Sequence, residues 1–202
     1  MKRTAKLIVG TACVGLLLLL PGRAAAAGGH YSIDGGTVAE RGQVHAALEA
    51  STFTWNVVPG TVAIHIRRGI GSQATPGEIW LDADLLDAGS FSWGVVQHEY
   101  AHQVDYLLLT PTDRAQIQAI LGGSSWCSGG EALAHDDNTC ERFATAVAWA
   151  YWPSAQNAFD PTQASGECWL RSAPLRALLG RLIGVSDPYV RVLGSATARK
   201  RP

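Results

Sequence analysis

The chain has 202 residues, of which 47% are hydrophobic and 16% are charged, and its formal net charge is −1. This length and composition suit one domain with a sizeable core, and they argue against disorder or a multidomain protein. Without the first 27 residues, 12 basic and 17 acidic side chains give a net charge of −5, which argues against a nucleic acid held by phosphate neutralisation.

The amino terminus reads as a targeting segment. Residues 1–27 combine a basic start, an apolar stretch over 7–20 and an Ala run over 24–27, which is the pattern of a secretory signal peptide. An uncleaved anchor is the alternative, but the apolar stretch is shorter than the roughly 20 residues that span a bilayer. We therefore expect a secreted, extracellular monomer without a membrane association after cleavage. Its single domain would cover 28–193 and be followed by a disordered tail over 194–202.

Periodicity predicts the remaining elements in chain order. A first amphipathic helix is expected over 37–53, and alternating residues predict strands over 62–66 and 77–82. The clearest helix lies between Ser90 and Leu109, with Pro111 just beyond it. Three further helices are expected, over 113–121, over 137–151 and from Ser172 onward, the last with Pro174 in its first turn.

The cysteines indicate a disulfide. Export removes Cys13 with the signal peptide and leaves Cys127, Cys140 and Cys168 in a compartment that permits disulfides. Cys127–Cys140 is the favoured pair because it closes a short loop, with Cys140–Cys168 as the alternative. The third thiol would stay free or pair between chains.

An H-E-x-x-H sequence, His98-Glu99-Tyr100-Ala101-His102, falls within the clearest helix. Residues i and i+4 lie one turn apart on the same face, so both imidazoles can bind one Zn²⁺ ion. Glu99 would then flank the ion and accept a proton from a zinc-bound water, as peptide hydrolysis requires. The alternative is a surface helix that carries two solvated histidines.

The two histidines need a third protein ligand. A metzincin-type continuation is excluded, because Asp105 and Leu108 occupy the positions where its Gly and its ligand would lie. Glu141 is the favoured candidate, since it begins a later helix whose alanines permit close packing on the first one. The alternatives are a Glu that merely complements the helix dipole, or a ligand from one of three other residues: Asp137, Glu131 or His135.

The order of these elements over 37–152 resembles the zincin metallopeptidases, and their gluzincin branch in particular. The resemblance implies an α+β fold in which a small mixed sheet packs on the H-E-x-x-H helix, with a mainly helical carboxyl-terminal half. It also implies His98, His102 and Glu141 as zinc ligands, Glu99 as the base, and 77–82 as the edge strand along which a peptide substrate lies. The chain lacks an N-E-x-x-S-D string around Glu141 and the extended helical domain of larger gluzincins, so the resemblance is to a minimal zincin.

The sequence defines less clearly which residues orient the imidazoles and which stabilise the oxyanion formed during hydrolysis. Asp105 lies on the same side of the helix as both histidines, so it is a candidate to accept the distal N–H of an imidazole. It is equally a candidate for a solvated helix residue. Five side chains are candidates for stabilising the oxyanion: Tyr100, Tyr106, Tyr151, His135 and Arg142.

The sequence thus predicts a secreted zinc metalloendopeptidase that acts on a peptide or protein substrate, with no nucleic-acid partner. The alternative is a catalytically inactive zincin-fold protein that binds zinc and serves as an interaction module of the cell envelope. Glu99 favours the enzyme, because a site that only binds metal has no need of this carboxylate. A lipase is a poorer account, since the chain contains no G-x-S-x-G sequence.

Overall fold

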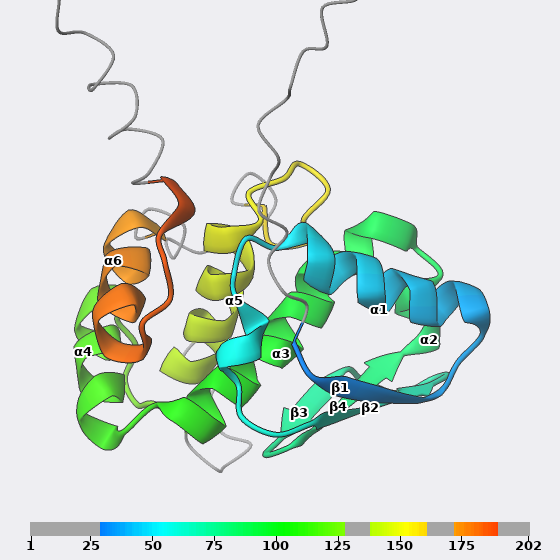
Figure 1. Cartoon of the computed structure of the whole chain (residues 1–202), viewed down its shortest axis with the longest axis horizontal. Coiled ribbons are helices and arrows are strands. Elements are labelled where there is room, and N and C mark those ends of the chain that lie inside the picture. Colours follow the sequence, from blue (N-terminus) through cyan, green and yellow to red (C-terminus); the bar gives the residue numbers. More distant parts are fainter. Residues whose placement is uncertain (1–28, 128–137, 161–171, 190–202) are drawn as a thin grey trace, which may run out of the picture.

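The computed structural model describes residues 29–127, 138–160 and 172–189 (Figure 1). The expected signal peptide over 1–27 and the expected tail over 194–202 lie outside these ranges. Among the described residues, no helix has both the length and the apolar character needed to cross a bilayer. One cysteine and three of the candidate ligand or oxyanion-stabilising residues also lie outside the described ranges: Cys168, Glu131, His135 and Asp137.

A mixed sheet of four short strands forms one layer of the molecule, in the order β1-β2-β4-β3. The neighbours β1–β2 and β2–β4 are parallel, whereas β3 runs antiparallel to β4. Together with the helices, this sheet makes the protein a mixed α+β fold, as the sequence predicts. The strands are β1 (Tyr31–Gly35), β2 (Val62–Arg67), β3 (Gln73–Thr75) and β4 (Glu78–Asp82).

The sheet corrects one expectation from the sequence. The strand expected over 77–82 is present as β4, but it lies between β2 and β3 and is not an edge strand. The outer position belongs to β3, which folds back on β4 through the turn at Pro76-Gly77. Neither β3 nor β1 was predicted, because β3 has only three residues and the alternation of β1 is confined to Tyr31–Gly35, with glycines on both sides.

One face of the sheet lies toward α1 and α3 (Figure 1), and α3 contacts β3 and β4. Alternate residues of the central strands are buried on that face, among them Ile64 and Ile66 of β2 and Ile79 and Leu81 of β4. This alternation has the period of two expected for a strand with one buried face. It explains why β2 and β4 were predictable from sequence.

The principal helices match the predicted ones within a few residues. Pro111, which was expected to follow the H-E-x-x-H helix as a breaker, is the first residue of the next helix, where its fixed φ is tolerated. The short α2 (Ala83–Leu86) and the 3-10 turns η1 (Trp55–Val57) and η2 (Gly89–Ser92) were not predicted. The longer helices are α1 (Val38–Ala50), α3 (Trp93–Leu108), α4 (Pro111–Leu121), α5 (Thr139–Tyr151) and α6 (Ser172–Ile183).

Helix α3 is the central element of the fold, between α1 and the sheet on one side and α5 on another. Its ten residues from Val96 to Asp105 are all buried. The polar ones among them need partners in the interior. Gln97 donates to the carbonyl of Ala47 on α1 over 2.8 Å. Gln103 accepts from Gly77 N–H over 2.7 Å and so fastens the β3–β4 turn to the helix.

The predicted disulfide between Cys127 and Cys140 is confirmed, with Cα atoms 5.6 Å apart. It joins the segment after α4 to the first turn of α5, directly beside Glu141. The two cysteines are 13 positions apart in the sequence, so the bond closes a short loop. A bond of this kind stabilises a fold mainly by restricting the unfolded chain.

Replacing both Cys127 and Cys140 with Ser should therefore lower the free energy of unfolding by about 3 kcal/mol. Urea denaturation under non-reducing conditions measures the loss. Cys168→Ser is the matched control, because it removes a thiol and leaves the bridge intact. An equal loss of stability in that control would show that the bridge is not the source of the effect.

Candidate metal centre

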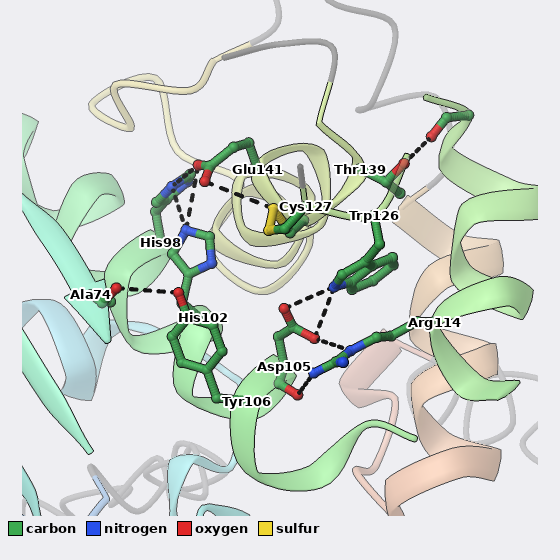
Figure 2. The surroundings of a disulfide bond; sticks show 12 residues. Ala74, His98, His102, Asp105, Tyr106, Arg114, Trp126, Cys127, Thr139 and Glu141 are labelled. Carbon is green, nitrogen blue, oxygen red and sulfur yellow. Dashed lines mark hydrogen bonds and ion pairs between the residues drawn. A yellow bond between two sulfur atoms is a disulfide. The ribbon is translucent and has the colours of Figure 1, made fainter. Parts of the chain in front are cut away.

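Three side-chain atoms from two helices converge in the interior of the protein. Nε2 of His98 and Nε2 of His102, both on α3, lie 3.2 Å apart. Oε2 of Glu141, on α5, lies 3.1 Å from the first of these atoms and 3.4 Å from the second (Figure 2). Both histidines are 4% exposed. The structure thus brings together the three residues that were predicted from the sequence as ligands.

The spacing of these atoms fits a tetrahedral zinc ion. Zinc binds His nitrogen and carboxylate oxygen at about 2.0–2.1 Å, so two ligands at a tetrahedral angle are separated by about 3.3 Å. All three observed separations lie close to that value. Two imidazoles and one carboxylate also make a ligand set that zinc accepts, with a fourth position available for water or substrate.

The packing of α5 on α3 explains how Glu141 reaches the histidines. Helix α5 buries Ala144 and Ala148, whose small side chains permit a close approach of the two helices. Glu141 lies in the first turn of α5 and keeps 18% of its side-chain surface exposed. The carboxylate therefore enters the site from its more open side, while the imidazoles form the buried side.

The electrostatics of the cluster favour opposite charges on its members. Burial on its own raises the pKa of Glu141, but hydrogen bonding to the rings of His102 and His98 outweighs burial and lowers this pKa well below its ordinary value. Burial also acts to lower the pKa of His102, and here the neighbouring Glu141 carboxylate outweighs it and raises the pKa. The site thus holds Glu141 as an anion, the form in which a carboxylate binds a metal, whereas the proton favoured on His102 must leave before that ring can act as a ligand.

Glu99 places a second carboxylate beside the cluster. One of its oxygens lies within 4.8 Å of ring nitrogens of both histidines, which makes Glu99 an alternative third ligand. Glu141 is closer, at 3.1 and 3.4 Å, which makes it the better placed of the two candidates for a third ligand. Burial raises the pKa of Glu99 to about 7. Among the described residues its carboxylate accepts no hydrogen bond, so it remains available to a water molecule or a substrate.

Contacts behind the ring of His98 orient it. Nδ1 of His98 lies 3.2 Å from Oγ1 of Thr145, one turn after Glu141 on α5. This contact leaves Nε2 of the ring to face the cluster, which is how metal-binding histidines are commonly oriented. The ring of Phe159 stacks on His98 at a centroid distance of 5.1 Å. Sequence reasoning missed Thr145, although its i+4 spacing from Glu141 was a usable signal.

Asp105 has partners other than the expected imidazole. Its buried carboxylate accepts hydrogen bonds from Arg114 Nε over 2.7 Å and from Trp126 Nε1 over 2.9 Å (Figure 2). Nδ1 of His102 is buried and has no hydrogen-bond partner among the described residues. The alternative of a solvated residue is also wrong, because Asp105 is 1% exposed.

The five candidates for oxyanion stabilisation differ in where they lie relative to the histidine cluster. Tyr106 lies at the site, with its ring stacked on His102 at 5.9 Å and its hydroxyl donating to the carbonyl of Ala74 on β3 (Figure 2). Tyr100 and Tyr151 belong to the hydrophobic core. Arg142 donates to the carbonyl of Leu121, and His135 lies outside the described residues.

A cavity of about 470 Å³ lies next to this region. Neither histidine of the cluster lines it, nor does Glu141, so the cavity is distinct from the metal centre. It adjoins the centre through Tyr106, which stacks on His102. Its lining consists of Asp105, Tyr106, Pro111, Arg114, Ala115, Gln118, Trp126 and Cys127.

Comparison with known proteins gives no significant match to a family model, to a curated protein or to a solved structure.

Proposed function

We propose that the protein is a secreted, zinc-dependent metallopeptidase of minimal zincin type. The observation that carries the proposal is the convergence of His98 Nε2, His102 Nε2 and Glu141 Oε2 at 3.1–3.4 Å, with the Glu99 carboxylate beside them. A site that only stored metal would need the three ligands and no adjacent carboxylate. The fourth residue therefore favours hydrolysis over simple metal binding.

In this proposal the ligand residues and the base have separate tasks. Zinc, when bound, supplies Lewis-acid polarisation of the scissile carbonyl and lowers the pKa of water. Glu99 accepts a proton from the attacking water and returns it to the nitrogen of the leaving amine. A carbon–oxygen bond forms and the carbon–nitrogen bond breaks, so the products are a carboxylate and an amine. Tyr106, whose ring stacks on His102, is our candidate to contact the substrate oxygen, for which its hydroxyl would have to leave the carbonyl of Ala74.

The position of β3 suggests where a substrate binds. It is the outer strand of the sheet on the α3 side, and Tyr106 and Gln103 of α3 both bind its residues, at Ala74 and Thr75. An extended peptide can add to an open sheet edge through its main chain. We propose that the peptide substrate lies along β3, beside the histidine cluster.

Secretion is part of the same proposal. The Cys127–Cys140 disulfide is compatible with an oxidising compartment. The basic and apolar pattern of residues 1–27 supports export.

The first test is metal content together with peptide cleavage. The purified protein should contain close to one zinc per chain by elemental analysis, and it should cleave members of a broad peptide library. Dialysis against a chelator should remove both zinc and cleavage, and added zinc should restore them. Zinc content near zero after expression with zinc would contradict the metal site. Full zinc content without cleavage would instead support the inactive interaction module.

A further inference from the structure

The segment of residues 121–127, here called the strap, fixes the beginning of α5. The first N–H groups of a helix have no partner within it and must find one elsewhere. In α5 the N–H of Thr139 donates to the carbonyl of Ser125 over 2.9 Å, and the N–H of Cys140 donates to the carbonyl of Trp126 over 2.8 Å. Because Glu141 follows directly, the strap sets the position of the turn that carries it.

The indole of Trp126 joins the strap to α3. Nε1 of this indole donates to both oxygens of Asp105, over 3.1 and 2.9 Å (Figure 2). Asp105 is 1% exposed and lies three residues after His102 on the same helix. Arg114 of α4 donates to the same carboxylate and balances its charge. The contact thus connects the helix of the two histidines to the start of the helix of Glu141.

The disulfide cannot replace this connection. It joins Cys127 of the strap to Cys140 of α5, so it keeps those two segments together without fixing either of them relative to α3. The hydrogen bonds from the indole to Asp105 have the opposite property, because they cross from the strap to α3. The disulfide thus joins the strap to α5, and the hydrogen bonds of Trp126 join the strap to α3.

We propose that Asp105 and Trp126 are positioning residues that hold the Glu141 carboxylate at binding distance from the histidine pair. They act through the strap and touch neither the metal nor the substrate. The inference deepens the proposed function and rests on its zinc site, but it does not depend on peptide hydrolysis. Groups that hydrogen-bond directly to the ligands of a metal typically contribute about 10- to 100-fold to metal affinity, so we expect the lower end of this range for two residues that act one contact further away.

The test is Trp126→Phe, which removes the N–H donor and keeps an aromatic ring against Phe143. Its zinc dissociation constant, measured by competition with a chromophoric chelator, should rise about tenfold. The visible absorption of the Co²⁺-substituted protein should also change in intensity and band position, because it reports the geometry of the ligands. A loss of fold stability alone would not change that spectrum in protein that remains folded.

Trp93→Phe is the matched control. It makes the same chemical change, but the indole N–H that it removes donates to Gln43 of α1 over 2.7 Å and not to Asp105. We expect it to leave the zinc affinity within about twofold and the Co²⁺ spectrum unchanged. An unchanged affinity and spectrum in Trp126→Phe would overturn the inference, as would an equal loss of affinity in Trp93→Phe. A wild-type protein that binds zinc but cleaves no peptide would contradict the proposed function alone.

Discussion

Replacing Glu99 with Gln should leave zinc content near one per chain and reduce peptide cleavage by about 10²- to 10⁴-fold, the usual contribution of a general base. The amide has nearly the same shape as the carboxylate but cannot accept the proton of the attacking water. Zinc binding should persist, because the three closest atoms at the site belong to His98, His102 and Glu141.

The matched control is Glu49→Gln, which makes the same chemical change on an exposed position of α1. It should keep both zinc and activity. Elemental analysis and initial cleavage rates at saturating zinc measure the two effects separately. Wild-type turnover in Glu99→Gln would remove Glu99 from its role as base. A loss of zinc in that variant would instead show that its carboxylate is a ligand.

The second large effect is expected for Glu141→Ala, which should weaken zinc binding by more than about 100-fold. Removing a direct ligand should cost more than removing a partner behind one, for which about 10- to 100-fold is typical. The loss leaves the two imidazoles of α3, and two ligands do not complete the three-residue set of a catalytic zinc site. Cleavage should fall with the zinc content.

Three variants together identify the third ligand. Zinc dissociation constants for Glu141→Ala, Asp137→Ala and Glu99→Gln should show a large loss only in the first. A larger loss in Asp137→Ala would assign the ligand to Asp137, two residues before the start of α5, an alternative that the sequence left open. The largest loss in Glu99→Gln would assign it to the carboxylate within the H-E-x-x-H sequence and would contradict the division of roles proposed above.

The structure also changes the expected relation between the sheet and the site. The resemblance to zincins implied that 77–82 forms the substrate edge, but β3 covers this strand on its outer side. Three residues of antiparallel pairing suffice to move the edge by one strand. A strand this short has no detectable periodicity, so the sequence did not reveal it.

The sequence by itself determined the local elements that carry the chemistry. The i, i+4 spacing of His98 and His102 and the periodicity of α3 and α5 are properties of neighbouring residues, and the short separation of Cys127 and Cys140 favoured their pairing. Only the tertiary structure decided which carboxylate approaches the imidazoles, that Thr145 contacts His98, and that Asp105 binds Trp126 and Arg114. The physical reason is that each of these contacts joins separate segments. Their distances depend on how α3, α4, α5 and the strap pack, and no local pattern specifies that packing.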